Sequence, residues 1–298
     1  MEQSKIDKSN QIDETALIGD NVELGKFNKI GKNVVIGSFN GQAGRIKLGD
    51  CNIINDNTRI LAGDEGIMIG DWNVFHNSML VMGESLMTIG HNCWFGQNTI
   101  LDSSGGLKIG NGVRVGMYSQ IWTHVASGEL IEGCNLFSKR ETIIKDNVWL
   151  VGSCIVSSGI VLEELGVFLI GSNITKSTSP KSVYAGNPAK LKEGLNFYDE
   201  ITIDKKFEMM GNWAKEFVLK FPIYQFELNN NIIRLFGKDE NNEQIIIIKD
   251  ENSNSIPYDG STVFNLTNKL YTKNLTEIER TFYKFIYNNK ARFIPINK

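Results

Sequence analysis

His124 is the side chain of this sequence best suited to moving a proton. The chain has three histidines, His76, His91 and His124. Histidine has an ordinary pKa of about 6.5, so at neutral pH it can take a proton from a hydroxyl group. We interpret His124 as a general base, because it opens a long segment that interrupts a regular repeat. The competing interpretation, a histidine that only hydrogen-bonds its surroundings, is the one we adopt for His76 and His91.

The elements that must position His124 are predicted by a repeat of six residues. Aliphatic residues recur at every sixth position over residues 12–60 and again over residues 144–174. This period fits neither a helix nor a simple alternating strand. It predicts one short strand per hexapeptide and three strands per coil, with the coils stacked into a solenoid around an aliphatic core. Glycine often follows the aliphatic residue, as in Ile30-Gly31, which we interpret as a tight corner with positive φ.

The interruptions of this repeat all fall on one predicted edge of the solenoid. The count is unbroken from Ile12 to Ile60, with the polar Gln42 at one inward position. Four insertions each follow the third strand of a coil, and the longest is Trp122–Ile143. Loops gathered on one edge of a regular scaffold usually carry function. The long insertion begins two residues before His124.

A histidine base also needs an acceptor on its second ring nitrogen. In the predicted stack, Asp102 starts the loop one strand away from Trp122, at a strand spacing of about 5 Å. Asp102 is therefore a candidate partner of His124, and a backbone carbonyl is an alternative. Three carboxylates of the long loop are further alternatives: Glu129, Glu132 and Glu141.

Three segments follow His124 in an order that resembles a known family. They are Asn147-Val-Trp149, Gly171-Ser-Asn-Ile-Thr-Lys176 and Ala185-Gly-Asn-Pro-Ala-Lys190. With the loop histidine, they resemble the hexapeptide-repeat O-acetyltransferases that act on galactosides, maltose and capsular polysaccharides, including polysialic acid. The resemblance covers roughly residues 70–192. It implies a mainly β fold, a left-handed parallel β-helix, and direct transfer of an acetyl group from acetyl-CoA to a sugar hydroxyl.

The resemblance also implies roles for individual residues. His124 would be the base, and Trp149 would line the site. Acetyl-CoA would lie between two subunits of a homotrimer, and no metal would take part. The residues that match positions lining the donor groove are Gly152, Ile170, Thr175, Lys176 and Lys190.

The acceptor is expected to be a hydroxyl of a bacterial surface glycan. Tyr118 and Trp122 flank His124 in the sequence, where aromatic rings could stack on a sugar. Lys139 and Arg140 could bind an anionic glycan such as a sialic-acid polymer. Three acidic residues on the same predicted edge would oppose that binding: Asp64, Glu84 and Asp102.

Composition argues against several classes of protein, namely nucleic-acid-binding, secreted and membrane-spanning proteins. The 298 residues are 41% hydrophobic and 22% charged, with a net charge of -3, which argues against nucleic-acid binding. A polar N-terminus and the lack of a long apolar run predict neither a secretory signal nor a membrane span. We expect free thiols and a cytoplasmic location, because none of the four cysteines forms a CxxC pair. They are Cys51, Cys93, Cys134 and Cys154.

The repeat ends near Thr175, and we divide the chain into residues 1–192 and 193–298. The second part is predicted to be an α+β appendage of unknown role. Its predicted elements are a helix over Lys205–Phe221, a hairpin of Ile232–Phe236 and Gln244–Ile248 around the turn 238–243, and a helix over Thr276–Asn288 capped by Asn274 or Thr276.

Other functions remain open on this scaffold. N-acetylation of an amino sugar nucleotide uses the same kind of base, and a solenoid without catalysis is a second alternative. A γ-class carbonic anhydrase would need three histidines on one zinc ion, and the three histidines of this chain lack the required close pair. A sugar-nucleotide pyrophosphorylase would need an N-terminal nucleotide domain, and a serine acetyltransferase would need a large helical N-terminal region before the repeat.

Overall fold

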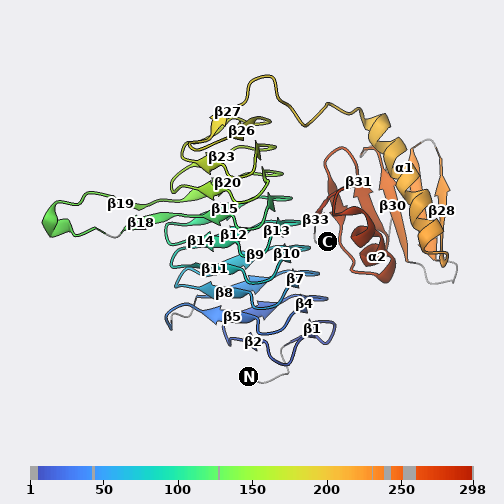
Figure 1. Cartoon of the computed structure of the whole chain (residues 1–298). Helices are drawn as coiled ribbons and strands as arrows, with labels where there is room; N and C mark the ends of the chain where they lie inside the picture. Colours follow the sequence, from blue (N-terminus) through green and yellow to red (C-terminus); the bar gives the residue numbers. More distant parts are fainter. Residues whose placement is uncertain are drawn as a thin grey trace. The chain divides into compact units, whose positions relative to one another are not determined.

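The computed structural model describes residues 6–41, 44–126, 128–229, 231–237, 243–250 and 260–296. The chain forms two compact units, Met1–Tyr198 and Asp199–Lys298. The first unit is a stack of coils in which each coil contributes one short strand to each of three parallel sheets (Figure 1). The predicted fold class, a left-handed parallel β-helix followed by an α+β part, is confirmed.

The three sheets form three faces of the solenoid. The first face contains β1 (Gln11–Ile12), β4 (Lys29–Ile30), β7 (Ile53–Ile54), β10 (Val74–Phe75), β13 (Trp94–Phe95), β16 (Arg114–Val115), β21 (Trp149–Leu150), β24 (Val167–Phe168), β26 (Val183–Ala185) and β27 (Lys190–Leu191). The second contains β2 (Leu17–Ile18), β5 (Val35–Ser38), β8 (Arg59–Ala62), β11 (Leu80–Gly83), β14 (Ile100–Asp102), β17 (Gln120–Ile121), β22 (Ile155–Val156) and β25 (Asn173–Ile174). The third contains β3 (Val22–Leu24), β6 (Ile46–Leu48), β9 (Ile67–Ile69), β12 (Met87–Ile89), β15 (Leu107–Ile109), β20 (Thr142–Ile144) and β23 (Val161–Leu162).

The predicted inward residues form the core. Leu101 pairs in register with Ile121, and Ile121 with Val156, so one aliphatic side chain stacks on the next. All three are fully buried, as are the corresponding residues on the other faces. Burial of one such side chain is worth about 1.5–3 kcal/mol, which accounts for the strictness of the sixfold spacing.

Two edges of the solenoid matter for the site. The loop edge is the boundary between the second and third faces, where the chain leaves β8, β11, β14 and β17. The plain edge is the boundary between the first and second faces. The insertions predicted to share one edge do lie on the loop edge.

The prediction of an unbroken register from Ile12 to Ile60 is wrong. Ile36 lies on β5 of the second face, and the next strand, β6, belongs to the third face, where it pairs with β3. Residues 39–41 and 44–45 therefore belong to a further connection at the loop edge. Gln42 itself lies outside the described residues. The connection is one repeat long, so it preserves the sixfold count and is invisible in the sequence pattern.

The predicted reason for the corner glycines is also wrong. Gly31, Gly70 and Gly90 do not have positive φ. Glycine is needed at these positions because the backbone of the adjacent coil is close. A Cβ on Gly70 would lie 2.7 Å from the carbonyl oxygen of Gly90. Positive φ occurs instead three residues after the inward aliphatic residue, where asparagine is frequent. Examples are Asn33, Asn57, Asn92, Asn98 and Asn147.

The longest insertion is a hairpin that projects from the loop edge (Figure 1). Its strands are β18 (His124–Ala126) and β19 (Phe137–Lys139), which pair antiparallel, and a 3-10 turn, η2 (Leu130–Glu132), lies near its tip. The side chain of Ile131 at the tip is 91% exposed. His124 therefore stands at the base of the arm.

Over its described residues, the second unit is a six-stranded sheet with two helices, as predicted for an α+β part. The predicted hairpin is confirmed by the antiparallel pairing of β29 and β30, although residues 238–242 of its turn lie outside the described residues. Of the two residues predicted to cap the second helix, Thr276 is the N-cap. The elements are α1 (Ile203–Lys220), β28 (Tyr224–Leu228), β29 (Ile232–Gly237), β30 (Gln244–Ile248), β31 (Thr262–Asn265), β32 (Leu270–Thr272), α2 (Glu277–Ile286) and β33 (Ile294–Ile296).

Candidate active site

Asp102 and His124 are in direct contact at the loop edge. Asp102 ends β14, and His124 begins β18 after the neighbouring strand β17, so the stacking of the two coils brings them together. Nδ1 of His124 lies 2.9 Å from Oδ2 of Asp102. A carboxylate can only accept, so the ring donates from Nδ1 and the lone pair of the neutral imidazole is at Nε2. The histidine side chain is 36% exposed, whereas Asp102 is fully buried.

The carboxylate of Asp102 is held on both oxygens. Oδ1 accepts from the hydroxyl of Ser104 at 2.6 Å and from its amide at 3.2 Å. Oδ2 accepts from the amide and the hydroxyl of Thr123, each at 2.8 Å. Thr123 Oγ1 in turn accepts from the amide of Gly105 at 2.8 Å. This network fixes the carboxylate, and the carboxylate fixes the orientation of the ring of His124.

The same hydrogen bonds determine the charge of Asp102. Burial on its own would raise the pKa of this carboxyl group, but the hydrogen bonds from Ser104, His124 and Thr123 together outweigh burial and lower the pKa below its ordinary value. Asp102 is therefore ionised at neutral pH. A buried carboxylate next to an imidazole stabilises the imidazolium that forms when the ring takes a proton.

Ser104 and Thr123 are site residues that sequence reasoning missed. A weak signal for Ser104 existed, because an aspartate followed two residues later by serine is a common turn in which the side chain accepts from the backbone. Thr123 could have been found by extending the strand pairing of Leu101 with Ile121 by two residues.

Trp122 and Lys139 lie beside the histidine, and Arg140 follows Lys139 in the hairpin. The rings of Trp122 and His124 meet edge to face with centroids 6.2 Å apart. Lys139 lies opposite His124 in the hairpin, and the amide of Arg140 donates to Thr123 O at 3.0 Å. The charge of Lys139 is paired with Glu84, whose Oε2 lies 2.6 Å from Nζ. Arg140 is thus the cation of this group with less of its charge committed to a carboxylate.

The residues predicted to bind the donor are divided between the two edges. Thr175 and Lys176 follow β25 and lie exposed on the loop edge, two coils beyond His124. Gly152 and Ile170 lie on the plain edge, where a Cβ on Gly152 would come within 3.9 Å of Ile170 Cδ1. Ile170 is 72% exposed. Lys190 is exposed on β27 at the C-terminal end of the first face.

The structure does not bring Tyr118 to His124, which corrects the expectation that it flanks the histidine. Tyr118 lies at the plain edge with positive φ, and strand β17 separates it from the loop edge. Six residues of near-extended chain span roughly 15–20 Å. Trp149 lies on the first face between Arg114 and Val167, 44% exposed, and so is also away from His124 of the same chain.

The other two histidines lie on different edges from His124. His76 follows β10 at the plain edge, with its ring 4.8 Å from that of Trp94, and burial lowers its pKa. His91 follows β12, and its Nδ1 accepts from the amide of Asp71 at 2.9 Å. In the part of the chain that the structure describes, no group of three or more histidine, cysteine, aspartate or glutamate side chains is arranged to hold a metal ion.

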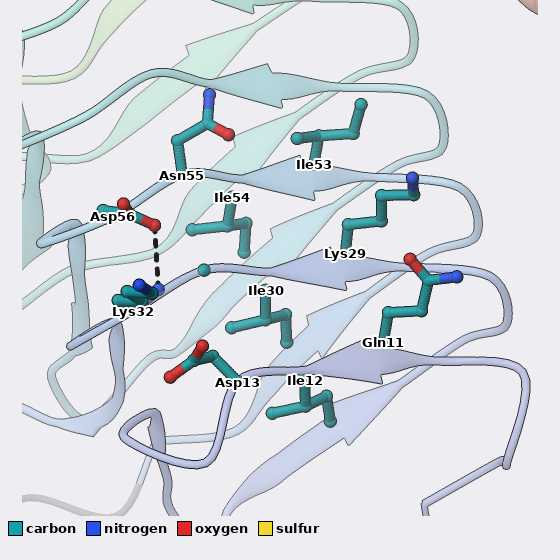
Figure 2. Close-up of a pocket in the computed structure, with 11 residues that line it drawn as sticks. Gln11, Ile12, Asp13, Lys29, Ile30, Lys32, Ile53, Ile54, Asn55 and Asp56 are labelled. Atoms are coloured by element: carbon teal, nitrogen blue, oxygen red, sulfur yellow. Dashed lines mark hydrogen bonds between the residues drawn. The ribbon is translucent and has the colours of Figure 1, made fainter.

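A separate hollow lies on the first coils (Figure 2). It has a volume of about 410 Å³, and Asp13, Lys29, Ile30 and Ile54 are among the residues that line it. Asp56 accepts from the amide of Lys32 at 2.8 Å. The residues that line this hollow include no histidine, cysteine or serine, so its chemistry differs from that of the loop edge.

No family model matches the chain. A probable macrolide acetyltransferase from Lysinibacillus sphaericus is 30% identical over 78 residues, which are 26% of this chain and 43% of that protein. The alignment thus spans less than half of the relative. The chain is similar to hexapeptide-repeat acyltransferases.

Solved structures with similarity to the chain include further enzymes of this kind. AntD, an N-acyltransferase from Bacillus cereus, has 14% identity and a TM-score of 0.33, covering 71% of this chain and 89% of its own. The polysialic acid O-acetyltransferase OatWY has 20% identity and a TM-score of 0.33, covering 67% and 91%. A UDP-N-acetylglucosamine acyltransferase from Campylobacter jejuni has 16% identity and a TM-score of 0.40, covering 70% and 90%. No helix in the described residues combines the length and apolar character needed to cross a membrane.

Proposed function

We propose that the protein transfers an acetyl group from acetyl-CoA to a hydroxyl of a bacterial surface glycan, with His124 as the general base. The observation that carries the proposal is the 2.9 Å contact between Asp102 and Nδ1 of His124, which turns Nε2 into the proton acceptor. The relative named as an acetyltransferase supports the acyl chemistry. Use of acetyl-CoA would place the reaction in the cytoplasm. This location agrees with the expectation that the four cysteines are free thiols in a reducing compartment.

The reaction needs one base and no covalent enzyme intermediate. Nε2 of His124 takes the proton of the acceptor hydroxyl while the hydroxyl oxygen attacks the thioester carbonyl. The new C–O bond forms, the C–S bond breaks, and the CoA thiolate receives the proton back from the imidazolium. Asp102 stabilises the imidazolium while it carries that proton. The products are the acetyl ester and free CoA thiol.

A homotrimer would complete this site. The predicted donor residues Gly152 and Ile170 lie on the plain edge, a full strand of the second face away from His124. A second copy could pack its plain edge against the loop edge of the first. The donor residues of one subunit and His124 of the other would then meet at one acetyl group. Apolar residues on the outer side of the second face support such packing, in a row that Arg59 and Gln120 interrupt. The apolar members of the row are Leu17, Val35, Leu80, Ile100 and Ile155.

The charges around His124 favour an acceptor with some anionic character. Arg140, the residue after Lys139, is exposed and donates from Nε to Ser138 Oγ at 2.8 Å, and Trp122 offers a ring on which a sugar could stack. Glu84 neutralises Lys139, so the local excess of positive charge is small. A capsular polysaccharide that contains sialic acid fits this pattern, because Arg140 could pair with one sugar carboxylate at a time.

The experiment that tests the proposal measures release of thiol from acetyl-CoA in the presence of a panel of acceptors. The panel contains capsular glycans with and without sialic acid, an amino sugar nucleotide for the alternative N-acetyl transfer, and a macrolide, because the similar sequence is named for macrolides. We expect release with a hydroxyl-bearing glycan. Release only with the amino sugar nucleotide or only with the macrolide would replace the glycan as acceptor. No release with any acceptor would favour a solenoid without catalysis.

We expect the Asp102→Asn variant to lose turnover because the imidazole loses the group that orients it, but to lose less than the roughly 10²–10⁴-fold expected when the base itself is removed. Its acid limb in the pH–rate profile should move to lower pH, because the imidazolium loses its counter-charge. Asp64→Asn, an exposed carboxylate on the same edge, is the control. A profile unchanged from that of the unmodified protein would show that another group orients His124.

A further inference from the structure

One row of side chains on the first face lines part of the hollow on the first coils (Figure 2). Strands β1, β4 and β7 pair in parallel and in register, so Gln11, Lys29 and Ile53 occupy the same position in successive strands. Each of them comes directly before a core residue, such as the buried Ile30 and Ile54, and therefore points outward. This outward row offers an amide, an ammonium group and an aliphatic surface to the hollow.

A second row of lining residues lies where these strands end at the plain edge. The members of this edge row are Asp13, Gly31, Lys32, Asn55 and Asp56. The amide of Lys32 donates to Oδ1 of Asp56 at 2.8 Å. Oδ1 of Asp13 accepts from the hydroxyl and the amide of Thr15 at 2.7 and 3.0 Å. Both carboxylates are therefore held in place by the protein itself.

The charges of the two rows balance. Lys29 and Lys32 supply two ammonium groups, and Asp13 and Asp56 supply two carboxylates. Among the described residues, neither lysine forms an ion pair, and Oδ2 of each carboxylate accepts no hydrogen bond. All four residues are at least partly exposed. Free donors and free acceptors therefore line one hollow whose net charge is close to zero.

This set of groups suits a sugar better than an anion or a nucleotide. The two carboxylates would repel a phosphate group, and none of the lining residues has an aromatic ring that could stack on a base. A sugar hydroxyl both donates and accepts, so it can pair with an ammonium or amide group and with a carboxylate. The aliphatic side chain of Ile53 can contact the C–H groups of a sugar ring. The volume of about 410 Å³ is in the range of sites that hold small organic groups.

We propose, on the basis of the glycan acetyl transfer proposed above, that this hollow is a second saccharide site, which holds one unit of the acceptor chain at a distance from the base. Strand β7 lies three coils from β16, which leads through β17 to His124, so the two sites are about 14 Å apart along the solenoid. In a cyclic trimer that packs plain edge against loop edge, the hollow of one subunit and His124 of its neighbour would open on the same groove. A chain of several sugars would then contact both.

The first test measures saccharide binding to the full-length protein by calorimetry, without acetyl-CoA. The probes are maltohexaose, which is neutral, a hexamer of sialic acid, and inorganic phosphate. We expect heat of binding from a hexasaccharide and none from phosphate. Lys29→Ala should weaken saccharide binding about tenfold or more, as expected for the loss of a hydrogen bond from a charged group. Asp13→Ala should weaken it as well, because the sugar loses an acceptor.

Lys47→Ala is the matched control, because Lys47 is an exposed, outward residue of β6 on the third face. It should bind the hexasaccharide as the unmodified protein does. Absence of binding by both hexasaccharides would overturn the proposal, and so would binding that neither Lys29→Ala nor Asp13→Ala weakens. Weakening by Lys29→Ala alone, with phosphate as an effective competitor, would show that the hollow attracts anions and would overturn its assignment to a sugar.

The second test connects the hollow to acetyl transfer. Thiol release is measured with polysialic acid and with the disaccharide of sialic acid, which is too short to reach from the base to the hollow. Lys29→Ala should raise KM for the polymer, leave kcat unchanged, and leave KM for the disaccharide unchanged. Equal KM values for the polymer in Lys29→Ala and the unmodified protein would contradict a role in acceptor binding. Saccharide binding without any thiol release would contradict the proposed acetyl transfer and leave the saccharide site standing.

Discussion

The His124→Ala protein is expected to turn over about 10²–10⁴ times more slowly than the unmodified protein, the usual contribution of a general base. Alanine removes Nε2 and leaves no group at the loop edge to take the acceptor proton. The side chain is at the surface and lies outside the aliphatic core, so the fold should persist. Thiol release measured at saturating acetyl-CoA checks the loss of turnover.

His76→Ala is the matched control, because His76 is a histidine at the opposite edge of the second face. It should retain near-normal turnover. Affinity for acetyl-CoA should be unchanged in the His124→Ala protein, since the predicted donor residues are elsewhere. Near-normal turnover of His124→Ala would contradict the assignment of the base.

A mixture of two inactive variants is expected to recover activity. His124→Ala removes the base, and Gly152→Trp fills the plain edge, where a single Cβ would fit but a large ring would cover the neighbouring Ile170. In a mixed trimer, a Gly152→Trp subunit still supplies His124, and a His124→Ala subunit still supplies an open plain edge. With random mixing in equal amounts, about a quarter of the shared sites would be intact, because each site needs one intact half from each of two neighbours.

The measurement is thiol release from co-expressed and separately purified variants. The mixture of separately folded trimers, which cannot exchange subunits quickly, serves as the control and should stay inactive. Activity no higher than that of the two variants alone would contradict a shared site. An active monomer in light scattering at catalytic concentration would contradict it as well.

Much of the solenoid is predictable because its core is a local pattern. Each inward residue is aliphatic because its side chain is buried in the solenoid core, so spacing alone locates Leu101, Ile121 and Val156. The contact between Asp102 and His124 follows from the same stacking, because residues one coil apart become neighbours in space. The sixfold repeat is therefore enough to make Asp102 a candidate partner of His124, 22 positions away, but it does not choose between Asp102, the three glutamates of the loop and a backbone carbonyl.

Other features depend on information that a repeat does not contain. The connection after Ile36 is hidden because its length equals one repeat. Nearness in sequence places Tyr118 beside His124, but a strand of the second face intervenes and carries the tyrosine to the other edge.

The hairpin at the loop edge has a fixed base, which positions the imidazole of His124, and an exposed arm whose length and sequence can vary. Its base is closed by the bond from the Arg140 amide to Thr123 and by the pairing of His124 with Lys139, so the arm beyond can lengthen, shorten or be exchanged without moving the imidazole. Insertions at exposed tips are the changes that folded proteins tolerate best. Transplanting arms from other solenoids onto this base is therefore a route by which one proton-transfer pair could come to serve many acceptors, in nature or in the laboratory.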